Sequence, residues 1–186
     1  MRVKFTEIQN AVERKKINEL YVKSVPAHEK SFVYFFWLKK GRKNVLFVNI
    51  YDDNKWVGFV FLSFNKDIVY VWFFATLDAD CSREYESAMF SEIKRLYPSH
   101  CIVLSIEAEN LNGDNAKQSM EGKQFYEKIG FRETSYFVKR ADDSFAIMFI
   151  GKTFHIEQFY SIHKEMGWLT GGLMVRSHKK QLQKRK

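Results

Sequence analysis

The sequence predicts an α/β (α+β) protein with a single mixed, mostly antiparallel six- to seven-stranded sheet and helices on both faces. Three strand-like runs, residues 45–51, 55–64 and 68–75, follow one another through short turn-rich connections, which is the pattern of an antiparallel meander. A segment with helical periodicity, residues 83–96, then leads into another apolar strand at 101–106. We expect the buried face of that helix to consist of Tyr85, Ala88, Met89, Ile93 and Leu96. Because a strand, a helix and a strand at this spacing form a crossover, the strands on either side of that helix should be parallel.

The N-terminal part supplies one more strand and two helices. Residues 2–7 alternate like a strand, and residues 12–24 repeat apolar positions with helical spacing. Residues 31–38 are a dense aromatic run, and we expect a short second helix there, with Phe32, Phe35 and Phe36 on one face. This face either packs in the core or lines a pocket for an acceptor substrate.

The C-terminal part predicts two further strands, at residues 133–139 and 145–149. Residues 151–172 then hold an amphipathic segment, which we expect to pack on the domain or on a partner. A second copy of the chain could be that partner, which would make a homodimer. Residues 173–186 form a basic tail, so that residues 1–150 make up the domain that carries the site.

The positive charge of the chain is concentrated in its tail. The formal net charge is +8 over 186 residues, but six of the positive charges, and no acid, lie from Arg176 onward. The rest of the chain therefore carries only +2. Such a tail can hold nucleic acid or an anionic membrane non-specifically, or it can simply be solvated. We expect nucleic acid to be bound, if at all, only through the tail.

Composition excludes several other classes of protein. Cys81 and Cys101 are too few for a disulfide scaffold or a zinc site. No apolar run reaches the roughly 18 residues that a membrane helix needs, and residues 1–5 lack the apolar core of a secretory signal. We expect a cytoplasmic protein that uses no metal and has no membrane partner.

Residues 124–131, Gln-Phe-Tyr-Glu-Lys-Ile-Gly-Phe, combine the end of a helix, a glycine stop and the start of a strand. Gly130 suits the left-handed conformation that ends many helices. Phe125 and Ile129 are four residues apart, so they should form a stripe that faces the core. Tyr126, beside them, can instead point into a cleft next to the sheet.

The order of these elements is similar to that of the GNAT family of acyl-CoA-dependent N-acetyltransferases. The strongest match is residues 125–131, which resemble the family's FYEKxGF segment, and the strand at 102–107 fits the strand before that helix. The resemblance covers residues 1–150. It implies that the two parallel strands splay apart around the pantetheine arm of acetyl-CoA. It also implies that the pyrophosphate binds main-chain N–H groups at the start of the crossover helix.

The resemblance implies roles for individual residues. Tyr126 would hydrogen-bond the departing thiolate, because an ordinary tyrosine, with a pKa of about 10, does not readily protonate the anion of a thiol whose pKa is about 8.5. Glu107 is the candidate general base, with Glu109 on the same face, although both could equally be solvated acids at a strand end. A main-chain N–H between Phe74 and Leu77 would stabilise the oxyanion. The residues that would bind acetyl-CoA are Phe74, Leu77, Ser82, Arg83, Tyr85, Ser87 and Ser119.

The presumed phosphate turn departs from the family pattern, which reads Arg/Gln-x-x-Gly-x-Gly/Ala. Here Glu84 and Glu86 replace the usual glycines, and Arg83 is the nearby cation. Asp78 and Asp80 lie just upstream. Acids at a helix start stabilise the helix by a few tenths to about 1 kcal/mol each, but they repel a pyrophosphate. Either cations from elsewhere compensate, or acetyl-CoA binds weakly, or it does not bind.

Two functions are consistent with these observations. The first is an N-acetyltransferase that moves an acetyl group from acetyl-CoA to a primary amine by direct attack, with the tyrosine assisting the thiolate. The second is a catalytically degenerate GNAT-like binding module that no longer uses CoA and whose basic tail contacts nucleic acid or a protein. The aromatic helix end favours the first function, and the acidic turn favours the second.

Overall fold

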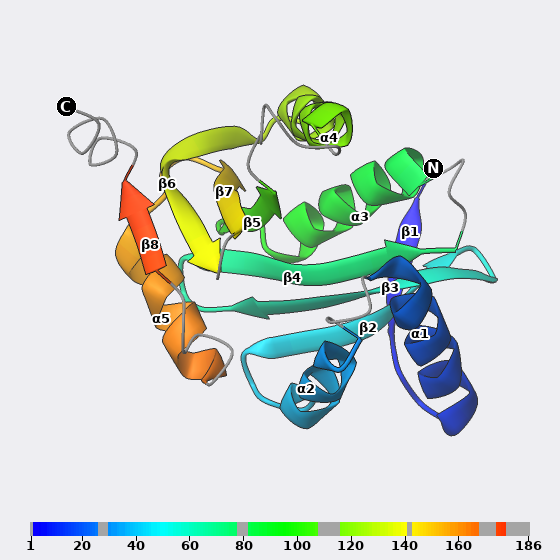
Figure 1. Cartoon of the computed structure of the whole chain (residues 1–186). Coiled ribbons are helices and arrows are strands. Elements are labelled where there is room, and N and C mark those ends of the chain that lie inside the picture. Colours follow the sequence, from blue (N-terminus) through cyan, green and yellow to red (C-terminus); the bar gives the residue numbers. More distant parts are fainter. Residues whose placement is uncertain are drawn as a thin grey trace. The chain divides into compact units, whose positions relative to one another are not determined.

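The computed structural model describes residues 2–25, 30–77, 82–107, 116–140, 143–167 and 174–177 (Figure 1). The chain divides into two compact units. The first consists of Met1–Asn65 and Val71–Pro98, and the second of Lys66–Tyr70 and Ser99–Lys186. Within the described residues, no helix is long and apolar enough to cross a membrane.

The first unit is a sheet with helices on both faces. Phe36 of the second helix stacks on Phe61, with ring centroids 4.4 Å apart, and also contacts Phe73. Phe90 of the third helix contacts Phe74, which directly follows Phe73 in the strand Ile68–Thr76. Because successive side chains of a strand point to opposite faces, these two helices cover opposite faces of the sheet (Figure 1). The elements are β1 (Val3–Glu7), α1 (Ala11–Ser24), α2 (Phe32–Lys39), β2 (Val45–Asp52), β3 (Lys55–Phe64), the later residues of β4 (Ile68–Thr76), and α3 (Ser82–Leu96).

The second unit contains the first residues of β4 and the C-terminal part of the chain. Its elements are β5 (Cys101–Glu107), α4 (Ala116–Lys128), β6 (Arg132–Arg140), β7 (Asp143–Ile150), α5 (Ile156–Met166) and β8 (Met174–Ser177). In α5, Phe159 is fully buried, and its ring centroid lies 5.3 Å from that of Tyr70 in β4. His163, one turn later, is also buried and lies 4.8 Å from the same tyrosine ring. The apolar side of this amphipathic helix therefore packs on its own unit.

The strands are hydrogen-bonded in the order β1-β2-β3-β4-β5-β7-β6-β8. The β4–β5 pair is parallel, whereas β1–β2, β2–β3, β5–β7, β6–β7 and β6–β8 are antiparallel. The predicted mixed, mostly antiparallel sheet with one parallel crossover is confirmed.

One strand lies where we expected only a basic tail. β8 pairs with β6, with Val175 opposite Val138. A strand edge with unpaired main-chain groups can take up even a short segment, because its N–H and C=O groups need partners. Four residues are too few for a recognisable alternating pattern, so the sequence did not predict this strand. The other residues of the predicted tail lie outside the described part of the chain.

A close ion pair lies in the C-terminal half of α3. Arg95 donates from Nε and Nη2 to the two carboxylate oxygens of Glu92, at 2.7 and 2.8 Å. These hydrogen bonds hold the pKa of Glu92 below its usual value, although burial of the carboxylate acts in the opposite direction.

The lowered pKa of Glu92 should make stability depend on pH. A carboxyl group with a lower pKa in the folded chain contributes stability above its unfolded pKa and loses that contribution as the pH falls through its folded pKa. In urea unfolding between pH 7 and pH 3, the wild type should therefore lose more stability than Glu92→Gln, and the two should converge at low pH. The control, Glu157→Gln at an exposed position of α5, should follow the wild type. Parallel pH profiles for the wild type and Glu92→Gln would contradict this role.

Candidate functional site

The predicted helix stop is present at the end of α4. Gly130 has a φ of +101° and donates its N–H to the carbonyl oxygen of Glu127 at 3.0 Å. Phe131 donates its N–H to the carbonyl oxygen of Tyr126 at 2.9 Å. The backbone therefore turns sharply at the glycine, and this turn fixes the position of Tyr126 relative to the start of β6.

Tyr126 is more buried than the stripe we expected to face the core. It is 8% exposed, and its ring centroid lies 5.5 Å from that of Phe125 and 5.7 Å from that of Phe131. Phe131 is buried as well, whereas Phe125 and Ile129 are only half-buried. The prediction of a Phe125–Ile129 core stripe is therefore only partly right. Aromatic contacts hold the tyrosine ring in one place, as a precisely positioned hydroxyl group would require.

Glu107 is the last residue of β5 and is exposed. It lies in the same unit as Tyr126, in which α4 contacts β5. In the sheet it is in register with Phe145 of β7. Its exposure is compatible with a base that works through water, and equally with a solvated acid at a strand end. Glu109, the second acid of the predicted pair, lies outside the described residues.

The end of β4 contains the predicted oxyanion donors. Leu77 donates its N–H to the carbonyl oxygen of Val57 in β3 at 2.8 Å. Because main-chain N–H groups alternate between the two edges of a strand, those of Phe74 and Thr76 point away from β3. The parallel ladder with β5 covers only Ile68–Tyr70, so these two groups lie beyond it. Leu77 is therefore excluded as a donor, and Phe74 and Thr76 qualify.

Tyr85, one of the residues expected to bind acetyl-CoA, lies in the core of the first unit. It is 4% exposed, and its hydroxyl donates to Oδ2 of Asp52, at the end of β2, over 3.3 Å. The side chain is thus part of the core of the first unit. The structure favours a packing role for this residue.

The two glutamates at the presumed glycine positions differ from each other. Glu84 is exposed, whereas the Glu86 side chain is only 5% exposed. Nη1 of Arg83 lies 3.1 Å from Oε2 of Glu86, in an ion pair within the first turns of α3. The cation that we expected to serve a phosphate is therefore already paired with a carboxylate, although its own side chain is 48% exposed.

The remaining predicted residues contribute less. Ser82 and Ser87 are half-buried in the first two turns of α3, so either hydroxyl could face a ligand there. Ser119 lies in α4, but its side chain is outside the described part, as are Asp78 and Asp80. Among the described residues, no three His, Cys, Asp or Glu side chains form a group that could hold a metal ion.

The aromatic run of α2 belongs mainly to the core. Phe35 and Phe36 are 3% and 4% exposed, and Phe36 is the residue that stacks on β3. Tyr34 and Leu38, one turn apart, are 72% and 71% exposed on the other side of the helix. Of the two alternatives for this run, the structure favours core packing for the buried pair.

The element order, the parallel β4–β5 pair and the glycine stop after α4 define the GNAT acyl-CoA N-acyltransferase fold, which confirms the resemblance seen in the sequence. In sequence, no protein-family model and no curated protein matches the chain.

Solved structures with this fold include several acetyltransferases. A protein assigned to the GNAT family, from Bacteroides thetaiotaomicron, has a TM-score of 0.62 and 21% identity, over 89% of this chain and 96% of its own. The aminoglycoside 6'-N-acetyltransferase from Enterococcus faecium has a TM-score of 0.63 and 13% identity, over 83% of this chain and 100% of its own. An aminoglycoside 6'-N-acetyltransferase in complex with coenzyme A has a TM-score of 0.58 and 12% identity, over 83% and 100%.

Proposed function

We propose that the chain is an acyl-CoA-dependent N-acetyltransferase that moves an acetyl group from acetyl-CoA to a primary amine. The observation that carries this proposal is the fold, which extends over 83% or more of the chain in three acetyltransferase structures, one of them holding coenzyme A. Fold alone does not fix an activity, so the proposal depends on the residues that follow.

In the proposed reaction, the amine nitrogen attacks the acetyl carbonyl carbon, and the carbon–sulfur bond breaks as the CoA thiolate leaves. The N–H of Phe74, which points away from β3, donates to the developing oxyanion. The hydroxyl of Tyr126 donates a hydrogen bond to the departing sulfur. Glu107 accepts the proton that the ammonium must lose, directly or through water. Each of these groups has a stated chemical partner, so each can be tested separately.

Residues at the start of α3 would hold the phosphates of acetyl-CoA. The helix dipole favours an anion there, and Ser82, Ser87 and Arg83 supply polar groups. The ion pair with Glu86 weakens the contribution of Arg83, and Glu84 adds an exposed negative charge. We therefore expect acetyl-CoA to bind more weakly than to a glycine-rich turn.

A second candidate is a binding module of GNAT fold that has lost CoA chemistry. The specific observation that favours it is the acidic first turn of α3, in which the nearby cation is engaged by Glu86. Under this alternative, the basic tail would provide the contact with nucleic acid or a protein.

Calorimetric titration with acetyl-CoA separates the two candidates. The wild type should give saturable heat below millimolar acetyl-CoA, and Glu86→Gln should bind about three- to tenfold more tightly, because it removes a buried negative charge and releases Arg83. Glu157→Gln, a matched removal of an acid from the first turn of α5, should leave the affinity unchanged. Absence of heat with both the wild type and Glu86→Gln would refute the enzyme proposal, and binding by the variant alone would favour the degenerate module.

The fold does not identify the amine that accepts the acetyl group, but amines of different chemical classes can be assayed. Proteins of similar structure act on an aminoglycoside, on spermidine and on the alanine of a ribosomal protein. A panel with an aminoglycoside, a polyamine and a peptide with N-terminal alanine therefore covers the relevant amines. Release of the CoA thiol is the signal for each.

A further inference from the structure

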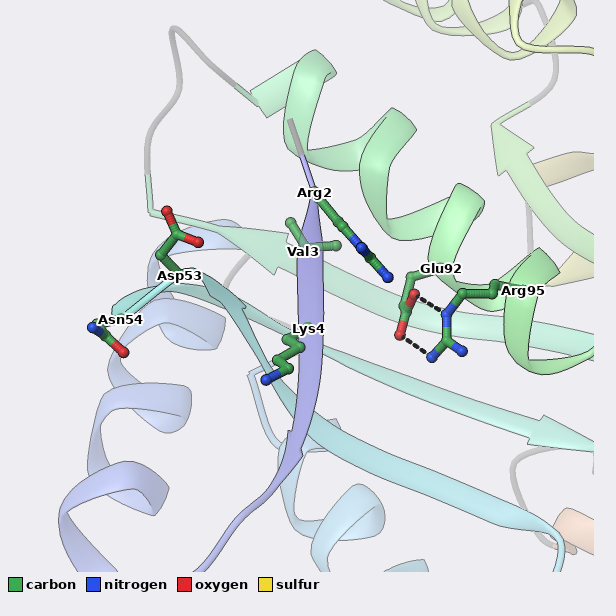
Figure 2. Close-up of a pocket in the computed structure, with 7 residues that line it drawn as sticks. All are labelled: Arg2, Val3, Lys4, Asp53, Asn54, Glu92 and Arg95. Atoms are coloured by element: carbon green, nitrogen blue, oxygen red, sulfur yellow. Dashed lines mark hydrogen bonds and ion pairs between the residues drawn. The ribbon is translucent and has the colours of Figure 1, made fainter.

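A polar hollow with a volume of about 750 Å³ lies in the first unit, where β1, α3 and the β2–β3 turn meet (Figure 2). It contains none of the residues assigned above to acetyl transfer. It is lined by Arg2, Val3, Lys4, Asp53, Asn54, Glu92 and Arg95. Figure 2 shows the Glu92–Arg95 pair to one side of β1 and the Asp53–Asn54 turn to the other.

The hollow runs along the outer edge of β1. Lys4 is in register with Tyr51, which interacts with α1, so Lys4 lies on the face of the sheet that α1 covers. Val3 is in register with Asp52, which accepts a hydrogen bond from Tyr85 of α3 on the opposite face. A hollow that is lined from both faces of one strand must pass around the strand's edge. Since β1 is the first strand in the sheet order, no described strand pairs with that edge.

The charges around this edge select the kind of segment that it can accept. Three cations, Arg2, Lys4 and Arg95, line the hollow together with two carboxylates, Asp53 and Glu92, so the lining carries one positive charge in excess. Glu92 accepts hydrogen bonds from Arg95 and is also attracted by Arg2. A second copy pairing through its own β1 would bring Arg2, Lys4 and Glu7, which together also carry one positive charge in excess. The C-terminal tail of this chain is basic as well. The charges therefore favour an acidic segment over both of these occupants.

We propose that the outer edge of β1 binds an extended acidic segment of a partner protein as an added strand. The main-chain groups on the outer edge of β1, with which no described strand pairs, supply the hydrogen bonds over this strand of five residues. Carboxylates on the added strand meet Lys4 on one face and Arg2 on the other. This interaction surface is independent of the proposed acetyl transfer.

The test uses the whole chain and a defined probe. The probe is a fluorescein-labelled, end-capped hexapeptide in which glutamate alternates with valine and threonine. Its fluorescence anisotropy should rise saturably as protein is added. Lys4→Glu should weaken binding about tenfold or more, because it replaces an attraction with a repulsion close to the added strand. Lys66→Glu, the same charge reversal at an exposed position of the second unit, should change the affinity less than twofold.

A second probe distinguishes strand addition from simple attraction between charges. N-methylation of alternate residues preserves the carboxylates but removes the N–H donors that face β1. This peptide should bind at least about tenfold more weakly than the parent. The parent peptide should also slow the hydrogen exchange of the β1 amides in the wild type.

Three results would overturn the proposal. One is the absence of saturable binding up to millimolar acidic peptide. Another is equal affinity for the parent and N-methylated peptides, or displacement of both by inorganic phosphate, which would make the hollow a general anion site. The third is equally tight binding of the matching peptide with lysine in place of glutamate, since charge would then not select the occupant.

Discussion

Turnover of an amine by Tyr126→Phe should fall about a hundredfold, while the KM for acetyl-CoA stays within about twofold of the wild type. The substitution keeps the ring that packs between Phe125 and Phe131 and removes only the hydroxyl. If that hydroxyl donates to the departing thiolate, its loss affects the transition state and not the ground state, so kcat falls and KM does not. Steady-state release of the CoA thiol, with whichever amine of the panel is turned over, measures both constants.

The control for this experiment removes a hydroxyl from the same unit but from a different place. Tyr160 lies in α5 and is 44% exposed, so Tyr160→Phe should leave both constants unchanged. Urea unfolding of Tyr126→Phe should show a loss of no more than about 1 kcal/mol, because the ring and its contacts with Phe125 and Phe131 are kept. A raised KM with unchanged kcat would show that Tyr126 binds acetyl-CoA without assisting the chemistry. Unchanged values of both would reduce it to packing.

The fold was predictable because its main signals are local in the sequence. Short turns between apolar runs fix adjacent strands, and a helix between two apolar strands implies a parallel crossover. The helix stop at Gly130 was predictable for the same reason, because a positive φ after a helix is a local preference of glycine. β8 could not be predicted in this way. Its four residues are too few to show an alternating pattern, and they form a strand by pairing with β6, which is distant in the sequence.

The candidate site was predicted less well because side-chain direction depends on how each helix is rotated against the sheet. In α3 the sequence indicated Tyr85, Met89 and Ile93 as buried, and all three are. It also indicated Ala88 and Leu96, but these are half-buried and exposed. Phe90, Glu86 and Glu92 are buried although the sequence did not indicate them. Each of the two glutamates forms an ion pair with an arginine of the same helix. A pattern based on hydrophobicity cannot indicate a buried carboxylate, because its burial depends on the partner that neutralises it.

The hollow beside β1 could not be predicted from the sequence, for a related reason. Its lining comes from Arg2–Lys4, from the Asp53–Asn54 turn and from one face of α3. These segments are far apart in the chain, and only the pairing of β1 with β2 and the packing of α3 on β1 bring them together. Charge counted along the chain indicated a basic tail and an almost neutral domain. It could not indicate that two cations flank an open strand edge.

Gly58→Ala should cost about 3 kcal/mol of unfolding free energy, near the upper end of the usual range for overpacking. A Cβ at this position in β3 would collide with the carbonyl oxygen of Ala75 in β4, and it would lie 3.1 Å from the carbonyl carbon of Ala75 and from Cα of Thr76. All of these atoms are main chain, so no side-chain rotation can relieve the contact. The strands would have to move apart. Urea unfolding of the purified variant measures the loss.

The matched control replaces a glycine that has free space around it. Gly122 lies within α4 with no atom in the way of a Cβ, so Gly122→Ala should stabilise the chain by about 0.5–1 kcal/mol through helix propensity. The opposite signs of the two substitutions separate a local steric effect from a general effect of losing glycine. A loss below about 0.5 kcal/mol for Gly58→Ala would mean that β3 and β4 do not approach so closely. The close approach of β3 and β4 would then no longer support the pairing in which the N–H of Leu77 points toward Val57. The inferred direction of the Phe74 N–H, away from β3, depends on that same pairing.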